Sequence, residues 1–162
     1  LNGTTNYMLG EITNGVPYAA ALADAQAKGF AEADPSGDVD GDDAAAKIRL
    51  VALLAFSEEI DLPEIPRDTI RDFAITPPLK GAVKRISVCE RSADGFSASL
   101  ELKDLPLDNF IAQADGEEAH AIFYFDDGDA YKIRGKGAGR WPTTESVMAD
   151  LYDISAAKMA AK

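Results

Sequence analysis

The chain has 162 residues, of which 46% are hydrophobic, so it is long enough for one globular domain with a hydrophobic core. Its formal net charge of −12 repels polyanions, and no basic stripe with interleaved aromatic residues offsets that repulsion, so nucleic acid is excluded as a partner. Cys89 is the single cysteine, which excludes an internal disulfide framework and leaves no Cys/His cluster for zinc.

The first half of the chain predicts helices, because Ala, Leu and Glu or Gln recur at helical spacing between glycines. Asn2 and the two threonines that follow it can cap a short helix that reaches Leu9. Residues 19–28 predict a second helix, which Gly29 ends in a left-handed conformation. After an acidic loop, residues 42–57 contain the run AAAKIRLVALLAF, which is apolar on most faces and predicts a largely buried helix.

The second half changes to strands after a linker between two prolines and a short helix expected at 66–73. Four segments are rich in β-forming residues, and a strong hairpin turn separates the last two of them: 83–90, 96–102, 119–125 and 130–134. Pro142 then opens a helix that runs to the carboxyl end. We therefore predict an α+β fold, with an antiparallel-rich sheet of about four to five strands and helices packed on one face.

The segment GFAEADPSGDVDGDDAAAK, residues 29–47, is the most informative part of the chain. It holds six carboxylates in the twelve residues from Glu32 to Asp43, and then one lysine, Lys47. A helix places Asp43 and Lys47 on one face, where an ordinary surface ion pair is one interpretation. The apolar helix that follows favours another, in which Lys47 lies at a buried helix start and acts as a proton donor.

The loop before that helix has three interpretations. Pro35 keeps its neighbour extended, so Glu32 and Asp34 can project in a fixed direction and bind an ammonium group, although a solvated acidic loop has the same composition. Calcium is the third interpretation, because four residues match positions 1, 3, 5 and 6 of an EF-hand loop: Ser36, Asp38, Asp40 and Gly41. Position 12, where a glutamate belongs, is Lys47, so we expect no metal site.

Two further features lie near the carboxyl end. Gly135, Gly137 and Gly139 resemble a phosphate-binding loop, but no βαβ unit follows, so a tight bend between strand and helix is the alternative. His120 accompanies no serine or cysteine motif, and we expect a solvated or edge-strand histidine. Without a GxSxG or HExxH motif the chain has no carrier for hydrolase chemistry.

Three blocks together resemble the homoserine dehydrogenase family and span nearly the whole chain: LNGTTNYML at 1–9, GFAEADPSGDVDGDDAAAK at 29–47, and GKGAGRWPTTESVMADL at 135–151. The resemblance implies a substrate-binding and dimerisation domain at 1–140 and a helix at 141–162 that returns to a Rossmann domain missing from this sequence. It also implies a homodimer formed through the sheet, and a region that is inactive without its nucleotide-binding domain.

The resemblance assigns a role to each matching residue. Lys47 matches the proton donor to the aldehyde oxygen when L-aspartate 4-semialdehyde is reduced to L-homoserine with NADP or NAD, in the biosynthesis of threonine and methionine. Asp43 and Glu32 match the acids that hold the substrate, and Gly29 matches the turn that touches substrate and cofactor. The other matches are Thr4 and Asp38 in the substrate pocket, and Glu32, Gly137 and Gly139 beside the nicotinamide nucleotide.

Several residues depart from the family pattern, among them Phe30 in place of a tyrosine and Asp42 in place of an apolar residue; the others are Ala46 and Arg140-Trp141. They leave room for an oxidoreductase of the same fold that acts on another small semialdehyde or hydroxy acid. The remaining alternative is a non-enzymatic acidic module that binds cations or a basic partner. No apolar run reaches the roughly 20 residues of a membrane span and no signal peptide is evident, so we expect a cytoplasmic protein without membrane attachment.

Overall fold

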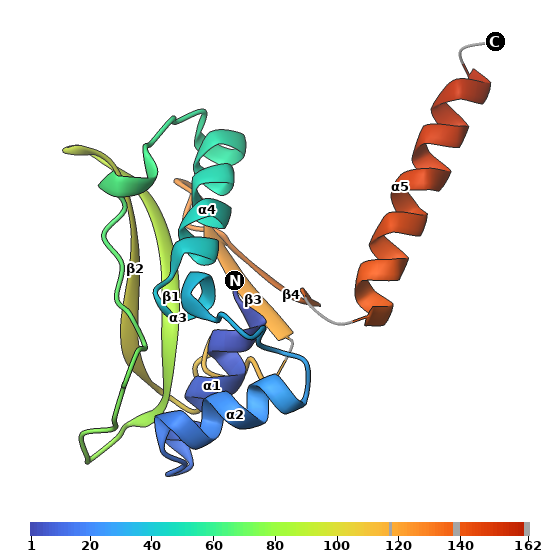
Figure 1. Ribbon diagram of the computed structural model, residues 1–162. Coiled ribbons are helices and arrows are strands. Elements are labelled where there is room, and N and C mark those ends of the chain that lie inside the picture. Colours follow the sequence, from blue (N-terminus) through green and yellow to red (C-terminus); the bar gives the residue numbers. More distant parts are fainter. Residues whose placement is uncertain (117, 138–139, 161–162) are drawn as a thin grey trace.

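The computed structural model describes residues 1–116, 118–137 and 140–160 (Figure 1). Its elements are, in chain order, α1 (Gly3–Thr13), α2 (Tyr18–Ala27), α3 (Ser36–Val39), α4 (Asp42–Val51), β1 (Gly81–Ser92), β2 (Gly95–Pro106), β3 (Glu118–Tyr124), β4 (Ala130–Lys136) and α5 (Arg140–Ala160). A π-helical turn at Ala52–Phe56 continues α4, and a 3₁₀ turn lies at Leu62–Glu64. The α+β class is confirmed, as are the four strands of the second half.

The strands pair as two antiparallel hairpins. β1 pairs with β2, and β3 pairs with β4, in registers that run the full length of each strand. Within the described residues these hairpins form two separate two-stranded sheets, where the sequence predicted a single larger sheet. The connection from β2 to β3 explains the separation. Lys84 Nζ donates to the carbonyl of Ala114 at 2.5 Å and Asn6 Nδ2 to that of Gly116 at 3.0 Å, which ties this connection to β1 and α1.

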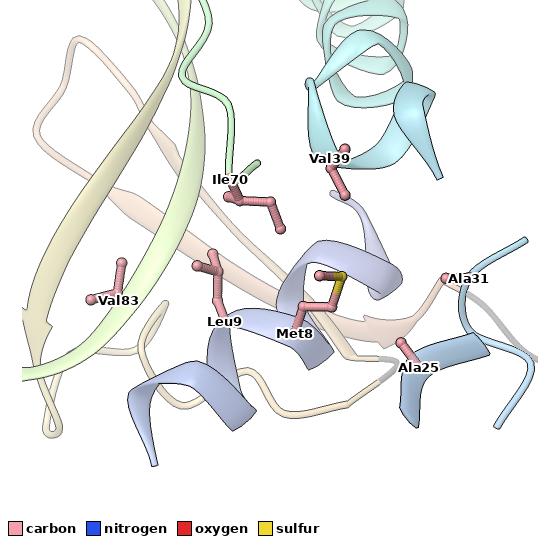
Figure 2. Packing of buried hydrophobic residues seen from close by; sticks show 7 residues of the cluster. All are labelled: Met8, Leu9, Ala25, Ala31, Val39, Ile70 and Val83. Atoms are coloured by element: carbon pink, nitrogen blue, oxygen red, sulfur yellow. The ribbon is translucent and has the colours of Figure 1, made fainter. Parts of the chain in front are cut away.

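The helices of the first half lie on one side of the β1–β2 hairpin (Figure 1). Figure 2 shows Met8 and Leu9 of α1 in the main core, between Val83 on β1, Ile70 and Ala25 of α2. A second cluster packs α4 against β2; it consists of Ala44, Ala45, Ile48, Ile65, Ala98 and Leu100. Helices packed on one sheet face are the arrangement predicted from the sequence.

Two helical predictions were wrong in part. The helix expected to be largely buried to residue 57 becomes a π-helical turn after Val51, where Leu53 and Leu54 are 44% and 83% exposed. Only one stripe of this segment faces β2, so its apolar character did not imply burial on every side. Residues 66–73 form no helix, because their backbone pairs with β2: Leu100 N donates to Pro66 O at 2.9 Å, and Asp68 N to Leu100 O at 3.0 Å.

Helix α5 stands apart from the layered part of the molecule (Figure 1). Its apolar side chains are largely exposed, among them Val147, Leu151 and Ile154, each at 54%. The division of the chain at residue 140 into a domain and a terminal helix stays a prediction. In the described part of the chain, no helix combines the length and the apolarity that a bilayer crossing requires.

The core assignment predicts a contrast between two leucines. Leu9 is fully buried, so Leu9→Ala should lower the free energy of unfolding by about 2–5 kcal/mol through lost burial and a cavity. The matched control Leu54→Ala removes the same atoms from an exposed site and should change it by less than about 0.5 kcal/mol. Urea unfolding followed by circular dichroism measures both, and equal effects would contradict the placement of the core.

Candidate active site

One cleft of about 760 Å³ gathers every predicted site residue that the structure describes. These residues are Thr4, Gly29, Glu32, Asp38, Asp43, Lys47 and Gly137. They come from α1, the loop after α2, α3, α4 and the end of β4, and further walls are formed by Asn2, Lys28, Phe30, Glu118 and Ala119. The remaining prediction, Gly139, lies outside the described residues. Four of the six carboxylates of the acidic segment, Glu32, Asp34, Asp38 and Asp43, and the one lysine beyond them are therefore brought together around a space of ligand size.

Asn2 connects two of the cleft carboxylates. Its Nδ2 donates to Asp38 Oδ1 at 2.6 Å and to Asp43 Oδ2 at 2.8 Å. Its Oδ1 accepts from the backbone N–H of Thr5 at 2.8 Å, as an N-cap of α1 does. One amide thus satisfies the helix start and holds two acids that would otherwise repel each other.

Asp43 and Lys47 lie one turn apart on α4. Lys47 Nζ donates to Asp43 Oδ2 at 2.6 Å and to the carbonyl of Leu1 at 3.2 Å. Partial burial favours the protonated acid, but the hydrogen bonds from Lys47 and Asn2 outweigh it and hold the pKa of Asp43 below its usual value. The Lys47 side chain is 46% exposed, so the expectation of a buried helix start was wrong: the cleft opens at this point of α4.

The loop after α2 forms a second wall. Gly29 has a φ of +77°, which places the chain in the left-handed region that favours glycine and turns it back toward α1. There Thr4 Oγ1 donates to the carbonyl of Phe30 at 2.5 Å, and the rings of Tyr7 and Phe30 stack with centroids 4.8 Å apart. Gln26 Nε2 donates to the carbonyl of Glu32 at 3.0 Å. These contacts fix the backbone that presents Glu32 at the cleft.

Lys28 places a second ammonium at the cleft. Its Nζ donates to Asp24 Oδ2 at 2.8 Å and to the Tyr7 hydroxyl at 2.6 Å. The hydrogen bond to Asp24 raises the pKa of Lys28, and the bond to the Tyr7 hydroxyl adds to this effect. Sequence reasoning missed Lys28, because lysine is common at the carboxyl end of a helix. Its favourable interaction with the helix dipole explains it there without any functional role.

Neither Asp42 nor His120 lines the cleft. Asp42 forms an ion pair with Arg67 at 2.9 Å, while the cleft is lined by its neighbour Asp43. His120 was expected to be solvated or on an edge strand. It lies on β3, an edge strand of the two-stranded β3–β4 sheet, so the second alternative is confirmed. Its side chain is only 3% exposed, stacks on Phe110 and has Nδ1 2.7 Å from the carbonyl of that residue, so it is not solvated. In the part of the chain that the structure describes, no three His, Cys, Asp or Glu side chains are grouped as a metal site requires.

Besides Lys28, sequence reasoning missed Asn2, which lines the cleft, and Arg85, which contacts the elements that form it. Asn2 was interpreted only as a helix cap, although an amide has two donors left for other partners once its oxygen caps a helix. Arg85 lies inside a predicted strand, and strand patterns give no sign of which distant backbone a long side chain reaches. It donates to the carbonyl of Asp38 at 2.6 Å.

The structure is an α+β domain with one cleft lined by carboxylates and two lysines. The family model described as homoserine dehydrogenase matches residues 1–152, and the chain belongs to this family. The family resemblance recognised from the three sequence blocks is thereby confirmed.

Individual relatives agree with this assignment. A homoserine dehydrogenase of Mycobacterium tuberculosis is 36% identical over 162 residues, which cover 93% of this chain and 37% of that protein. One of Bacillus subtilis is 36% identical over 163 residues, covering 95% of this chain and 37% of that protein. A crystal structure of Staphylococcus aureus homoserine dehydrogenase superposes with a TM-score of 0.85 at 30% identity, over 96% of this chain and 41% of that one. The chain spans little more than a third of the length of the curated relatives it matches.

The hydrogen bonds of Asp43 predict a pH dependence of stability. Because the pKa of Asp43 is lower in the folded state than its usual 3.8, the unfolded chain takes up a proton first as the pH falls. The contribution of Asp43 to the free energy of unfolding is fully present when the pH is above its usual pKa. It disappears as the pH falls through the lower pKa that Asp43 has in the folded state. Asp43→Asn should therefore show a shallower loss of stability between about pH 5 and 3. Urea unfolding at a series of pH values measures the slope, and a slope as steep as that of the wild type would contradict the network.

Proposed function

We propose that this chain supplies the substrate-binding and proton-donating groups of an oxidoreductase that interconverts L-homoserine and L-aspartate 4-semialdehyde with NAD or NADP. One observation carries the proposal: Glu32, Asp38, Asp43 and Lys47, from three separate segments, line one cleft in a member of the homoserine dehydrogenase family. The relatives that carry this name support the reaction type.

The charges of the cleft suit the substrate. Homoserine carries an ammonium group, a carboxylate and a hydroxyl group, so it needs acceptors at one end and a donor at the reacting oxygen. The proposed acceptors for the substrate ammonium are Glu32 and Asp43, with Asp38 beside them; all three line the cleft. Asp38 is held by Asn2 at 2.6 Å, so its carboxylate is oriented before the ligand arrives.

Lys47 is the proposed proton donor. When the aldehyde is reduced, its carbonyl carbon receives a hydride and its oxygen must receive a proton to become an alcohol. The Lys47 ammonium provides that proton, and Asp43, 2.6 Å away, keeps the ammonium pointed along the cleft. In the reverse direction the neutral amine takes the proton of the homoserine hydroxyl.

The proposed place of the nicotinamide ring is beside the glycines that line the cleft. A Cβ added to Gly29 would meet no atom within 4 Å, so the chain borders open space there, and one added to Gly137 would make an ordinary contact with Ala119 Cβ at 3.7 Å. We propose that Gly29, Glu32, Gly137 and Gly139 hold the nucleotide, the last from the sequence resemblance. When bound, NAD(P) supplies or accepts the hydride.

We also propose that the family's homodimer forms through the second hairpin. β3 and β4 expose apolar side chains: Phe123 at 37%, Tyr131 at 62% and Ile133 at 55%. Such a surface favours association with another apolar face over solvent.

The homoserine formed in the proposed reaction would enter the biosynthesis of threonine and methionine.

The role of Lys47 predicts a specific kinetic defect. In the full-length gene product, Lys47→Ala should lower kcat for homoserine oxidation by at least about a hundredfold, because proton transfer loses its carrier. The KM for the nucleotide should change by less than about threefold, since Lys47 acts on the reacting oxygen. Steady-state kinetics with both substrates varied measure the two parameters.

Lys103→Ala is the matched control, because Lys103 lies on β2 and pairs with Glu101 at 2.9 Å. It should leave both constants near the wild-type values. Wild-type turnover in Lys47→Ala would refute the assignment, and loss of activity in both variants would show that the effect is not specific to the cleft.

A further inference from the structure

Arg85, on β1, contacts two elements that build the cleft, α1 and the end of α3. Its Nη2 donates to Thr5 Oγ1 at 2.7 Å and to the carbonyl of Asp38 at 2.6 Å, and its Nη1 donates to the carbonyl of Val39 at 3.1 Å. Thr5 Oγ1 itself donates to the carbonyl of Asp38 at 3.1 Å. The guanidinium therefore spans α1 and the end of α3 with three of its donors.

We propose that Arg85 is a positioning residue for substrate binding: it fixes the backbone that carries Asp38 and, through Thr5, the start of α1 that carries Asn2. This inference rests on the proposed function of the cleft. Asn2 in turn holds the carboxylates of Asp38 and Asp43, so a displacement at Arg85 reaches both acids.

The start of α4 also packs on this guanidinium. Gly41, which precedes α4, has a φ of +92°, and a Cβ there would lie 3.3 Å from Arg85 Nη1. A side chain at Gly41 would crowd the guanidinium, and the left-handed φ also favours glycine at this position. Since α4 carries Asp43 and Lys47, Arg85 sets the position of this pair relative to Asp38.

The positive charge of Arg85 lies among the carboxylates of the acidic segment. Burial lowers its pKa to about 10, while the carboxylates of Asp38, Asp43, Asp40 and Asp42 act in the opposite direction. The guanidinium is cationic at neutral pH and is a positive charge beneath the acidic segment. A lysine has the same charge but offers no rigid fork, so it cannot reach Thr5, Asp38 and Val39 together.

Arg85→Lys in the full-length gene product tests the proposal by amide hydrogen exchange and by kinetics. We expect exchange in residues 36–43 to be at least about tenfold faster than in the wild type, because local opening becomes easier. The KM for homoserine should rise about tenfold, while the KM for the nucleotide stays within about twofold. Uniform changes in both KM values, or unchanged exchange in 36–43, would overturn the proposal.

Arg91→Lys is the matched control on the same strand. Arg91 is half exposed and donates to Glu58 and to the carbonyl of Phe56, both remote from residues 36–43. It should leave exchange in that segment and the homoserine KM unchanged, and an equal effect there would also overturn the proposal.

Thr5→Val decides the matter if Arg85→Lys does not fold. It removes one acceptor of the guanidinium and keeps the side-chain shape. We expect exchange in residues 36–43 and the KM for homoserine to rise less than in Arg85→Lys. If neither quantity changes, the proposal is overturned. A wild-type protein that does not oxidise homoserine would refute the proposed function alone. The exchange rates of residues 36–43 would still decide whether Arg85 holds the segment.

Discussion

The repulsion among six carboxylates within twelve residues is the constraint on which the site depends. Each acid that the fold brings close to another has a donor from elsewhere in the chain. Asp40 accepts from Arg71 at 2.5 Å, Asp42 forms an ion pair with Arg67 at 2.9 Å, and Asp43 accepts from Lys47 at 2.6 Å. Single exposed ion pairs add little stability. Their effect here is on geometry, because each partner fixes the direction in which its carboxylate points.

The same pairing divides the acids between two surfaces. Asp40 and Asp42 are held by arginines that follow the 3₁₀ turn, whereas Glu32, Asp38 and Asp43 line the cleft. Gly41, a left-handed residue, separates α3 from α4, and each side of it contributes one acid to each surface: Asp38 and Asp40 precede it, and Asp43 and Asp42 follow it. Sequence position alone could not predict which acid lies on which surface, because adjacent residues such as Asp42 and Asp43 have the same side chain but different partners.

Local patterns predicted the elements well and their long-range pairing less well. Asn2, Gly29 and the hairpin turn at 126–129 act within a few residues, and the helix starts, helix ends and hairpins that they predict are present. The two separate sheets and the extended segment at 66–73 depend on contacts with Lys84 and Leu100, which are distant in sequence. A proline-bounded segment has no local signal for pairing with a strand that comes thirty residues later.

Lys84 is a second buried charge on which the cleft depends. The second hairpin forms part of the cleft wall, because β3 contributes Glu118 and Ala119 and the end of β4 contributes Gly137. These residues belong to the second hairpin, which is positioned by the connection after β2. Lys84 is 7% exposed, and burial lowers its pKa, while the nearby carboxylate of Asp115 acts in the opposite direction. Its ammonium donates to Asn6 Oδ1 at 2.7 Å as well as to Ala114 O. A buried ammonium is costly, and this one stabilises the fold because its hydrogen bonds join β1 to α1 and to the connection that leads to the second hairpin.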